Sequence, residues 1–333
     1  MQNKTMRLII ISLLLMAFSI AAICLRVSNQ HEYSEHCMFG GYVKQAPKNN
    51  DIDIYESSLS RQTISIISKK MSDKNETFFR PSRLPAINNS FPDINSFSQT
   101  FVNDTIPPLL VDNPENTIMN YFSVLQQASN LTENKNGGCG NVGYSKTPYP
   151  VAYNFLSLSN KKSMSYDEYL DSFEGIGHIN LLKIIPIITN NKDEYKYFIE
   201  LEILEGSSVG VTTFNYYTGE LILTKLKDLF YIDSLFLIPE DFFCAAYHGW
   251  VHNAELYVEI IYGNWCGLIM KQYAPVQDDY KKKIIIDGVD NKKYMFEFAK
   301  LTNGTDILIN SLVKEDNGWI PVEIDVKRQS PLT

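Results

Sequence analysis

The chain has 333 residues, of which 44% are hydrophobic and 20% are charged, and its formal net charge is −8. This composition excludes global disorder, which requires few hydrophobic residues and a high charge. The acidic balance and the lack of a basic stripe argue against a nucleic-acid partner, because binding phosphates requires clustered Lys and Arg.

The first element is an apolar segment, Leu8–Leu25, in which none of the eighteen residues is charged. As a helix it would be about 27 Å long, just enough to cross a hydrocarbon core of about 30 Å. Lys4 and Arg7 precede it and Arg26 follows it, and basic residues on a short leading side hold that end in the cytoplasm. We therefore predict a single-pass cell-membrane protein, with a signal anchor over residues 1–26 and the bulk of the chain extracytoplasmic.

Two alternatives start from the same residues. Ser19–Ala21 is a small-x-small site at which a signal peptide would be removed, which would make the protein secreted. Cys24 lies at the depth of a lipoprotein cysteine, although Ile23 stands where a small residue is expected. All three interpretations export the chain, and its Asn, Lys and Ile bias is consistent with the AT-rich genome of a Gram-positive bacterium.

Export would place four cysteines in an oxidising compartment, enough for two disulfides: Cys37, Cys139, Cys244 and Cys266. The pair to test first is Cys244 with Cys266, because both flank the same predicted helix. The chain has no CxxC motif, which excludes a zinc ribbon and a thioredoxin-like redox pair.

Residues 27–110 show no sustained period of 2 or 3.6 and are rich in Asn, Ser, Asp and Pro. We predict a disordered extracytoplasmic spacer. A flexible chain of this length, ~80 residues, has an end-to-end distance of roughly 50 Å.

Residues 111–238 form the first predicted domain. Asn113-Pro114-Glu115 combines an Asn cap with Pro at the first helical position, and apolar residues then recur at helical spacing as far as Ala128. A capping box at Ser165–Glu168 begins a second helix.

Predicted strands follow at 179–188, 195–204, 211–217, 220–226 and 230–237, with a turn at Thr218-Gly219. In the second of them Glu200 and Glu202 alternate with apolar residues, which predicts one dry face and one wet face.

Residues 239–333 form the second predicted domain, with a helix over 239–262 and strands at 283–287, 293–301, 306–314 and 319–324. The connections Asp287-Gly288, Asn303-Gly304 and Asn317-Gly318 are turn dipeptides. A helix followed by an antiparallel meander occurs twice, which predicts an α+β fold of two units, each a curved antiparallel sheet with its helix.

This order of elements resembles the nuclear-transport-factor-two-like, or cystatin-like, cone superfamily in a tandem arrangement. The resemblance rests on Ile118, Tyr121 and Phe122 of the first helix and on Trp319 in the closing strand, whereas Phe230–Ile232 stands where the first unit's tryptophan is usual. The resemblance implies a cone fold, which serves a few enzymes, many small-ligand binders and envelope components, so it selects no function.

The candidate site residues lie on the predicted helix over 239–262 and just after it. His248, His252, Glu255 and Glu259 fall on one face, opposite the apolar stripe, and we interpret this face as solvated. The histidine pair could hold zinc with two ligands, but catalytic zinc requires three protein ligands. Tyr257 and Trp265, with Tyr262, could line an aromatic cleft.

We therefore expect a non-catalytic, membrane-anchored extracytoplasmic protein that binds an envelope protein or a peptidoglycan-associated component and needs no cofactor. Two alternatives remain open. One is a zinc-assisted hydrolase using His248, His252 and Glu255, and the other is a small-ligand-binding lipoprotein.

Overall fold

The computed structural model describes residues 35–44, 102, 105–138, 144–191, 193–240 and 246–326. The predicted membrane segment Leu8–Leu25, Cys139, Cys244 and most of the predicted spacer lie outside this part of the chain. Within it, no helix is long and apolar enough to span a bilayer. The described residues form an α+β fold with largely antiparallel sheets, as the sequence predicts.

The first sheet has six strands in the order β1-β2-β6-β5-β4-β3. All neighbours are antiparallel except β2 and β6, which pair in parallel. The strands are β1 (Glu35–Met38), β2 (Gly41–Lys44), β3 (Ile176–Ile187), β4 (Tyr195–Gly206), β5 (Thr212–Leu226) and β6 (Leu229–Pro239).

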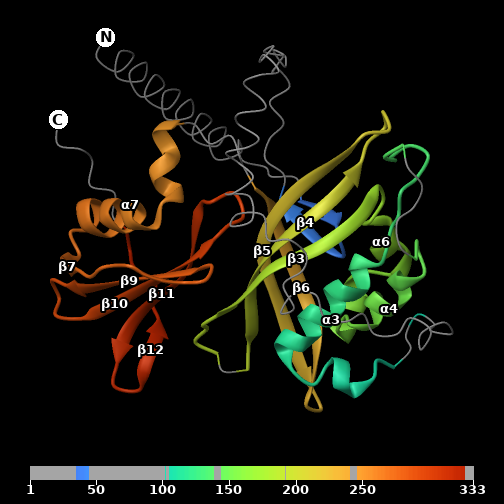
Figure 1. Ribbon diagram of the computed structural model, residues 1–333. Coiled ribbons are helices and arrows are strands. Elements are labelled where there is room, and N and C mark those ends of the chain that lie inside the picture. Colours follow the sequence, from blue (N-terminus) through green and yellow to red (C-terminus); the bar gives the residue numbers. More distant parts are fainter. Residues whose placement is uncertain are drawn as a thin grey trace, which may run out of the picture.

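Helices cover one side of this sheet (Figure 1). They are η2 (Pro108–Leu110), α3 (Pro114–Gln126), α4 (Pro148–Asn154), α5 (Leu158–Ser163) and α6 (Tyr166–Asp171). Asn113 caps α3 by accepting hydrogen bonds from the backbone N–H groups of Glu115 and Asn116, and Ser165 and Glu168 form the capping box of α6. Both predicted helix starts are confirmed, and the largest hydrophobic core lies between these helices and the sheet.

The second sheet has the order β12-β11-β10-β9-β7, and β8 also pairs with β9. Its strands are β7 (Ile269–Gln272), β8 (Val276–Asp278), β9 (Lys281–Gly288), β10 (Lys293–Lys300), β11 (Asp306–Glu315) and β12 (Gly318–Pro321). Gly304 and Gly318 have φ angles of 85° and 128°, as the predicted turns after β10 and β11 require. Three helical segments pack on this sheet: η3 (Ala246–His252), α7 (Ala254–Val258) and η4 (Glu259–Trp265).

The prediction of one continuous helix over 239–262 is wrong. The helical path breaks at Asn253, whose backbone is extended (φ −122°, ψ 117°) and whose side chain accepts a hydrogen bond from Leu256 N–H at 3.0 Å. Asn favours such capping positions over helix interiors because its side chain competes for backbone hydrogen bonds. One helical wheel therefore cannot relate the histidines before Asn253 to the acids after it.

The predicted turn at Thr218-Gly219 is also wrong, because both residues lie inside the continuous strand β5. The chain reverses instead at Lys227 and Asp228, whose φ angles of 51° and 66° are those of a type I′ hairpin. Gly219 serves close packing: a Cβ there would lie 1.9 Å from the Phe236 carbonyl oxygen of β6.

Residues 35–44, which the sequence analysis assigned to the spacer, form the edge hairpin of the first sheet. Its turn residue Phe39 is 1% exposed, and its ring lies 5.0 Å from that of Tyr217 in an edge-on contact. Each strand has only four residues, too few for a period to emerge, and pairing with the distant β6 decides their conformation.

The alternation in β4 predicts that its outer face is exposed to water along the whole strand. Part of this face is instead buried. Ile185 and Phe198 on this face form a buried cluster with Ala299 and Leu301 of the second sheet, and Glu200 is 0% exposed. The second sheet lies against the side of the first sheet that the helices leave free (Figure 1). A period-2 pattern identifies which residues share a face but not what covers it.

We expect Gly219→Ala to destabilise the full chain by about 1–3 kcal/mol, because the new methyl group meets backbone that cannot move without separating β5 from β6. Chemical denaturation would measure the change. Gly249→Ala is the matched control, since nothing lies within 4 Å of its Cβ position, and its effect should stay within about 0.5 kcal/mol. Equal effects of the two substitutions would contradict the packing role of Gly219.

Candidate functional site: a polar junction and a cavity between the sheets

A β-bulge in β3 places a lysine at the junction of the two sheets. Leu181 pairs with Leu201 of β4, but Lys183 pairs with Glu200, so the register shifts at Leu182. Because side chains alternate between faces, the extra residue turns Lys183 away from the helix-covered core and onto the face of Glu200.

Lys183 and Glu200 form a buried ion pair, with side-chain exposures of 5% and 0%. Thr302, in the turn between β10 and β11 of the second sheet, makes hydrogen bonds to both members of this ion pair. Its backbone N–H donates to Glu200 Oε1 at 2.8 Å, and its Oγ1 accepts a hydrogen bond from Lys183 Nζ at 2.9 Å. Charges removed from water are tolerated when they are paired and hydrogen-bonded, and this arrangement meets both conditions.

Two further hydrogen bonds cross the junction. The Tyr280 hydroxyl donates to the Ile184 carbonyl oxygen at 3.1 Å, and Ile188 N–H donates to Asn310 Oδ1 at 3.0 Å. Together with the buried apolar cluster, these contacts hold β3 and β4 against β10 and β11.

A cavity of about 520 Å³ opens beside this junction. Apolar residues from both sheets form most of its wall: Ile187, Phe198, Phe236, Ile238, Leu301, Ile307, Leu308 and Ile309. A smaller group of its lining residues carries polar side chains: Thr218, Glu220, Glu240, His252, Asn303 and Thr305.

Glu240 is the polar lining residue with the most unusual environment. Both of its carboxyl oxygens are buried, and neither faces a hydrogen-bond donor among the described residues. Burial raises the pKa of Glu240 to about 9, the adjacent Glu200 carboxylate acts in the same direction, and Lys183 opposes them. Burial and the neighbouring negative charge both disfavour an ionised Glu240, so this environment favours the neutral carboxyl group at pH 7.

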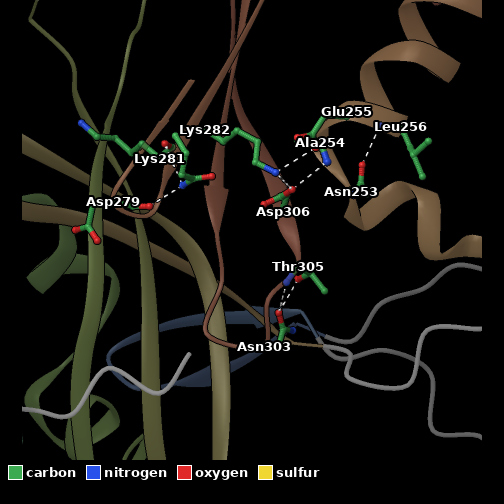
Figure 2. Close-up of polar contacts among 11 residues, drawn as sticks. Asn253, Ala254, Glu255, Leu256, Asp279, Lys281, Lys282, Asn303, Thr305 and Asp306 are labelled. Carbon is green, nitrogen blue, oxygen red and sulfur yellow. Dashed lines mark hydrogen bonds and ion pairs between the residues drawn. The ribbon is translucent and has the colours of Figure 1, made fainter. Parts of the chain in front are cut away.

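A second ion-pair cluster fixes the cavity wall near η3 (Figure 2). Lys282 Nζ lies 3.1 Å from Glu255 Oε2 and 2.8 Å from Asp306 Oδ2, and Asp306 also accepts a hydrogen bond from Ala254 N–H. This cluster ties the start of α7 to β9 and β11, directly after His252.

On the other side of Asp306, Asn303 Oδ1 accepts hydrogen bonds from the backbone N–H and the hydroxyl of Thr305, at 2.9 and 2.7 Å (Figure 2). The turn that carries these two lining residues is therefore ordered by its own hydrogen bonds.

Among the residues whose side chains the structure describes, the predicted site residues are not brought together. His252 is half-buried and lines the cavity, whereas Glu255 is paired with Lys282. Tyr257 and Trp265 pack with Trp250 against the hydrophobic core of the second sheet. The ring centroid of Trp250 lies 6.5 Å from that of Tyr257 and 5.6 Å from that of Trp265.

The side chain of His248 lies outside the described residues, as does Cys244, so the Cys244–Cys266 disulfide stays a prediction. Burial raises the pKa of the Cys266 thiol. Within the part of the chain that the structure describes, no group of three or more His, Cys, Asp or Glu side chains could hold a metal ion.

The sequence analysis missed Lys183 and Glu240. Lys183 carried a usable signal, because it interrupts an apolar run from Leu181 to Ile188, and a lysine is almost never fully buried without a partner. Glu240 carried none, since its environment comes from residues of β3 and β4 that lie far away in the chain.

We expect Lys183→Met to destabilise the full chain by about 3–5 kcal/mol, because it leaves the buried Glu200 carboxylate without its cation. The control is Lys196→Met on β4, which breaks a 2.7 Å ion pair with Glu220 whose side chains are 24% and 48% exposed. That pair should contribute less than about 1 kcal/mol. Denaturant titration of both variants would test this difference. A similar loss of unfolding free energy in the two variants would show that the buried ion pair does not hold the junction.

We expect Glu240→Gln to change how stability depends on pH. The raised pKa keeps Glu240 protonated in the folded chain up to about pH 9, whereas the unfolded chain loses this proton near the ordinary glutamate pKa of 4.5. The folded state therefore binds more protons between these values, and the stability of the wild-type chain falls as the pH rises, by up to about 1.4 kcal/mol per unit.

Glutamine cannot ionise, so the stability of the Glu240→Gln variant should match the wild type near pH 5 and exceed it increasingly up to pH 9. Denaturation midpoints across this range would measure the difference. The exposed Glu315→Gln should follow the wild-type curve, and parallel curves for wild type and Glu240→Gln would refute the neutral carboxyl group.

No protein-family model matches the chain, and no curated protein matches it. Among solved structures, a protein described as "Ntf2 like protein involved in plasmid conjugation" matches 52% of this chain and 87% of its own, with 9% sequence identity and a TM-score of 0.17. Values this low do not establish a shared fold.

Proposed function

We propose that this chain is a non-catalytic binding protein whose cavity between the two sheets takes a small, largely apolar molecule. The observation that carries the proposal is the cavity itself, with its volume of about 520 Å³ and a wall that is mostly apolar but includes six polar residues. Small-molecule sites in proteins have this size and composition, and they form preferentially where two structural units meet.

Two observations favour binding over the zinc-assisted hydrolysis that the sequence left open. The Glu255 carboxylate is paired with Lys282, 3.1 Å away, so it is not free to act as a general base. His252 lines the cavity beside apolar residues, and Glu255 is not among the lining residues, so the two are not assembled around one point.

The sequence supplies the rest of the proposal. We propose that the apolar segment Leu8–Leu25 exports the chain and anchors it, so that the cavity faces the extracytoplasmic side, where the ligand or a partner would be a cell-envelope component. The arrangement of α3, α4 and α6 on one side of the first sheet supports a cone-like unit there. The second sheet, with α7, would be the second unit.

We expect the full chain to bind the neutral dye phenylnaphthylamine, with an increase in the fluorescence of the dye as it leaves water. Ile238→Trp should weaken this binding at least tenfold, because the larger side chain fills the cavity at a lining position that is 44% exposed. Ile320→Trp on β12 is the matched control, since Ile320 is 42% exposed and lies outside the lining. A dye that binds neither wild type nor control, or binds all three chains equally, would refute the proposed function.

A further inference from the structure

We propose that a second cavity, beside the start of β6, binds a small zwitterion with an apolar body, as an apolar amino acid or a short apolar peptide is. Lys161 pairs with the carboxylate group of this ligand, and Asp233 pairs with its ammonium group. This inference goes beyond the proposed function, because the second cavity shares no lining residue with the cavity between the sheets.

The second cavity has a volume of about 470 Å³. Three parts of the chain form its wall: residues 105–106 before η2, side chains between residues 154 and 161 at the end of α4 and in α5, and side chains between residues 224 and 233 around the β5–β6 hairpin. Small-molecule sites have this size, and they combine apolar surface with a few polar or charged groups that orient the ligand.

Hydrogen bonds hold the segment after α4 beside β6. Ser157 N–H donates to the Ile232 carbonyl oxygen at 2.7 Å, and Ile232 N–H donates to the Phe155 carbonyl oxygen at 2.9 Å. The Asn160 side-chain amide also donates to the Asp233 carbonyl oxygen at 2.9 Å. This part of the cavity wall is therefore formed before a ligand arrives, which lowers the entropy cost of binding.

Lys161 supplies a positive charge to this cavity without a carboxylate to pair with among the described residues. Its ammonium nitrogen lies 3.4 Å from Asn154 Oδ1 and 5.1 Å from the centre of the Tyr153 ring. Asn154 also lines the cavity. Burial lowers the pKa of the Lys161 ammonium group, and a bound anion would offset this loss of hydration. The other lysine of the wall, Lys225, already pairs with Asp228 at 2.8 Å.

Asp233 supplies the matching negative charge. Its Oδ1 accepts a hydrogen bond from the Ser157 hydroxyl at 2.7 Å, and within the part of the chain that the structure describes no cationic side chain pairs with it. Lys161 lines the same cavity but does not pair with Asp233. The cavity therefore presents one cation and one anion, and neither has an ionic partner among the described residues.

A zwitterion satisfies both charges, whereas a ligand with a single charge satisfies one and is repelled by the other. An organic anion would gain Lys161 but meet the like charge of Asp233, and an organic cation would meet the reverse. The apolar body of the ligand also has a place, because Ile106, Leu156 and Leu158 line the cavity. Leu158 is 68% exposed, so covering it would remove apolar surface from water.

Isothermal titration of leucine and of leucyl-leucine into the full chain tests the inference. Each parent ligand has two matched analogues: the C-terminal amide lacks the carboxylate group, and the deamino derivative lacks the ammonium group. We expect the wild-type chain to bind at least one parent ligand, and to bind both of its analogues at least about tenfold more weakly, because each analogue loses one charged hydrogen-bonding group. The tighter of the two parent ligands identifies the source as a free amino acid or a peptide.

Substitutions test the two anchors separately. Lys161→Met and Asp233→Asn should each weaken binding of the parent ligand by about tenfold or more. The controls are Lys162→Met and Asp316→Asn, since both residues are exposed and neither lines the cavity. Both controls should bind the ligand as the wild type does. Ile238→Trp, which fills the cavity between the sheets, should also leave this binding unchanged.

Three results would overturn the inference: no binding of either parent ligand to the wild type, an analogue that binds as tightly as its parent, or undiminished binding by Lys161→Met or Asp233→Asn. The comparison of ligands uses the wild-type chain, so it holds even if a variant fails to fold. Absence of phenylnaphthylamine binding would instead remove the proposed function and leave the zwitterion site in place.

Discussion

The buried ion pair between Lys183 and Glu200 is the constraint on which the arrangement of the two sheets depends. Removing two charges from water costs several kcal/mol for each ion, and that cost is offset only when geometry and additional hydrogen bonds are good. Thr302 supplies both a donor to Glu200 and an acceptor for Lys183, and it comes from the other sheet. The pair is therefore satisfied only when the turn between β10 and β11 is docked, which links the packing of one sheet to that of the other.

The same junction generates the cavity and its chemistry. The second sheet covers Phe198 and Glu200 but leaves space beside them. There Glu240, which follows β6, lies with its carboxyl group against a carboxylate that is already paired. In this position the neutral form of Glu240 is favoured, because burial and the neighbouring carboxylate both oppose a negative charge.

Sequence patterns predicted this fold well where the controlling interaction is local. The Asn cap of α3, the capping box of α6 and the glycine turns after β10 and β11 act over three or four residues, and all are present. Patterns failed where a distant strand decides the outcome. Thr218-Gly219 resembles a turn, but Gly219 is needed for close contact with Phe236 of β6, which local sequence does not reveal. The hairpin at 35–44 likewise depends on pairing with β6.

The amino-acid sequence by itself determined the α+β class, most strands of both sheets and the acidic character that argues against nucleic acid. It also contains a signal that we missed, Lys183 as a charge inside an apolar run, but it does not indicate the partner of this lysine. Tertiary structure decided the rest: that Glu200 is buried, that a bulge aims Lys183 at it, and that Glu240 lines a cavity. The physical reason is that burial and electrostatics depend on which surfaces meet, and here these surfaces come from strands more than a hundred residues apart in the chain.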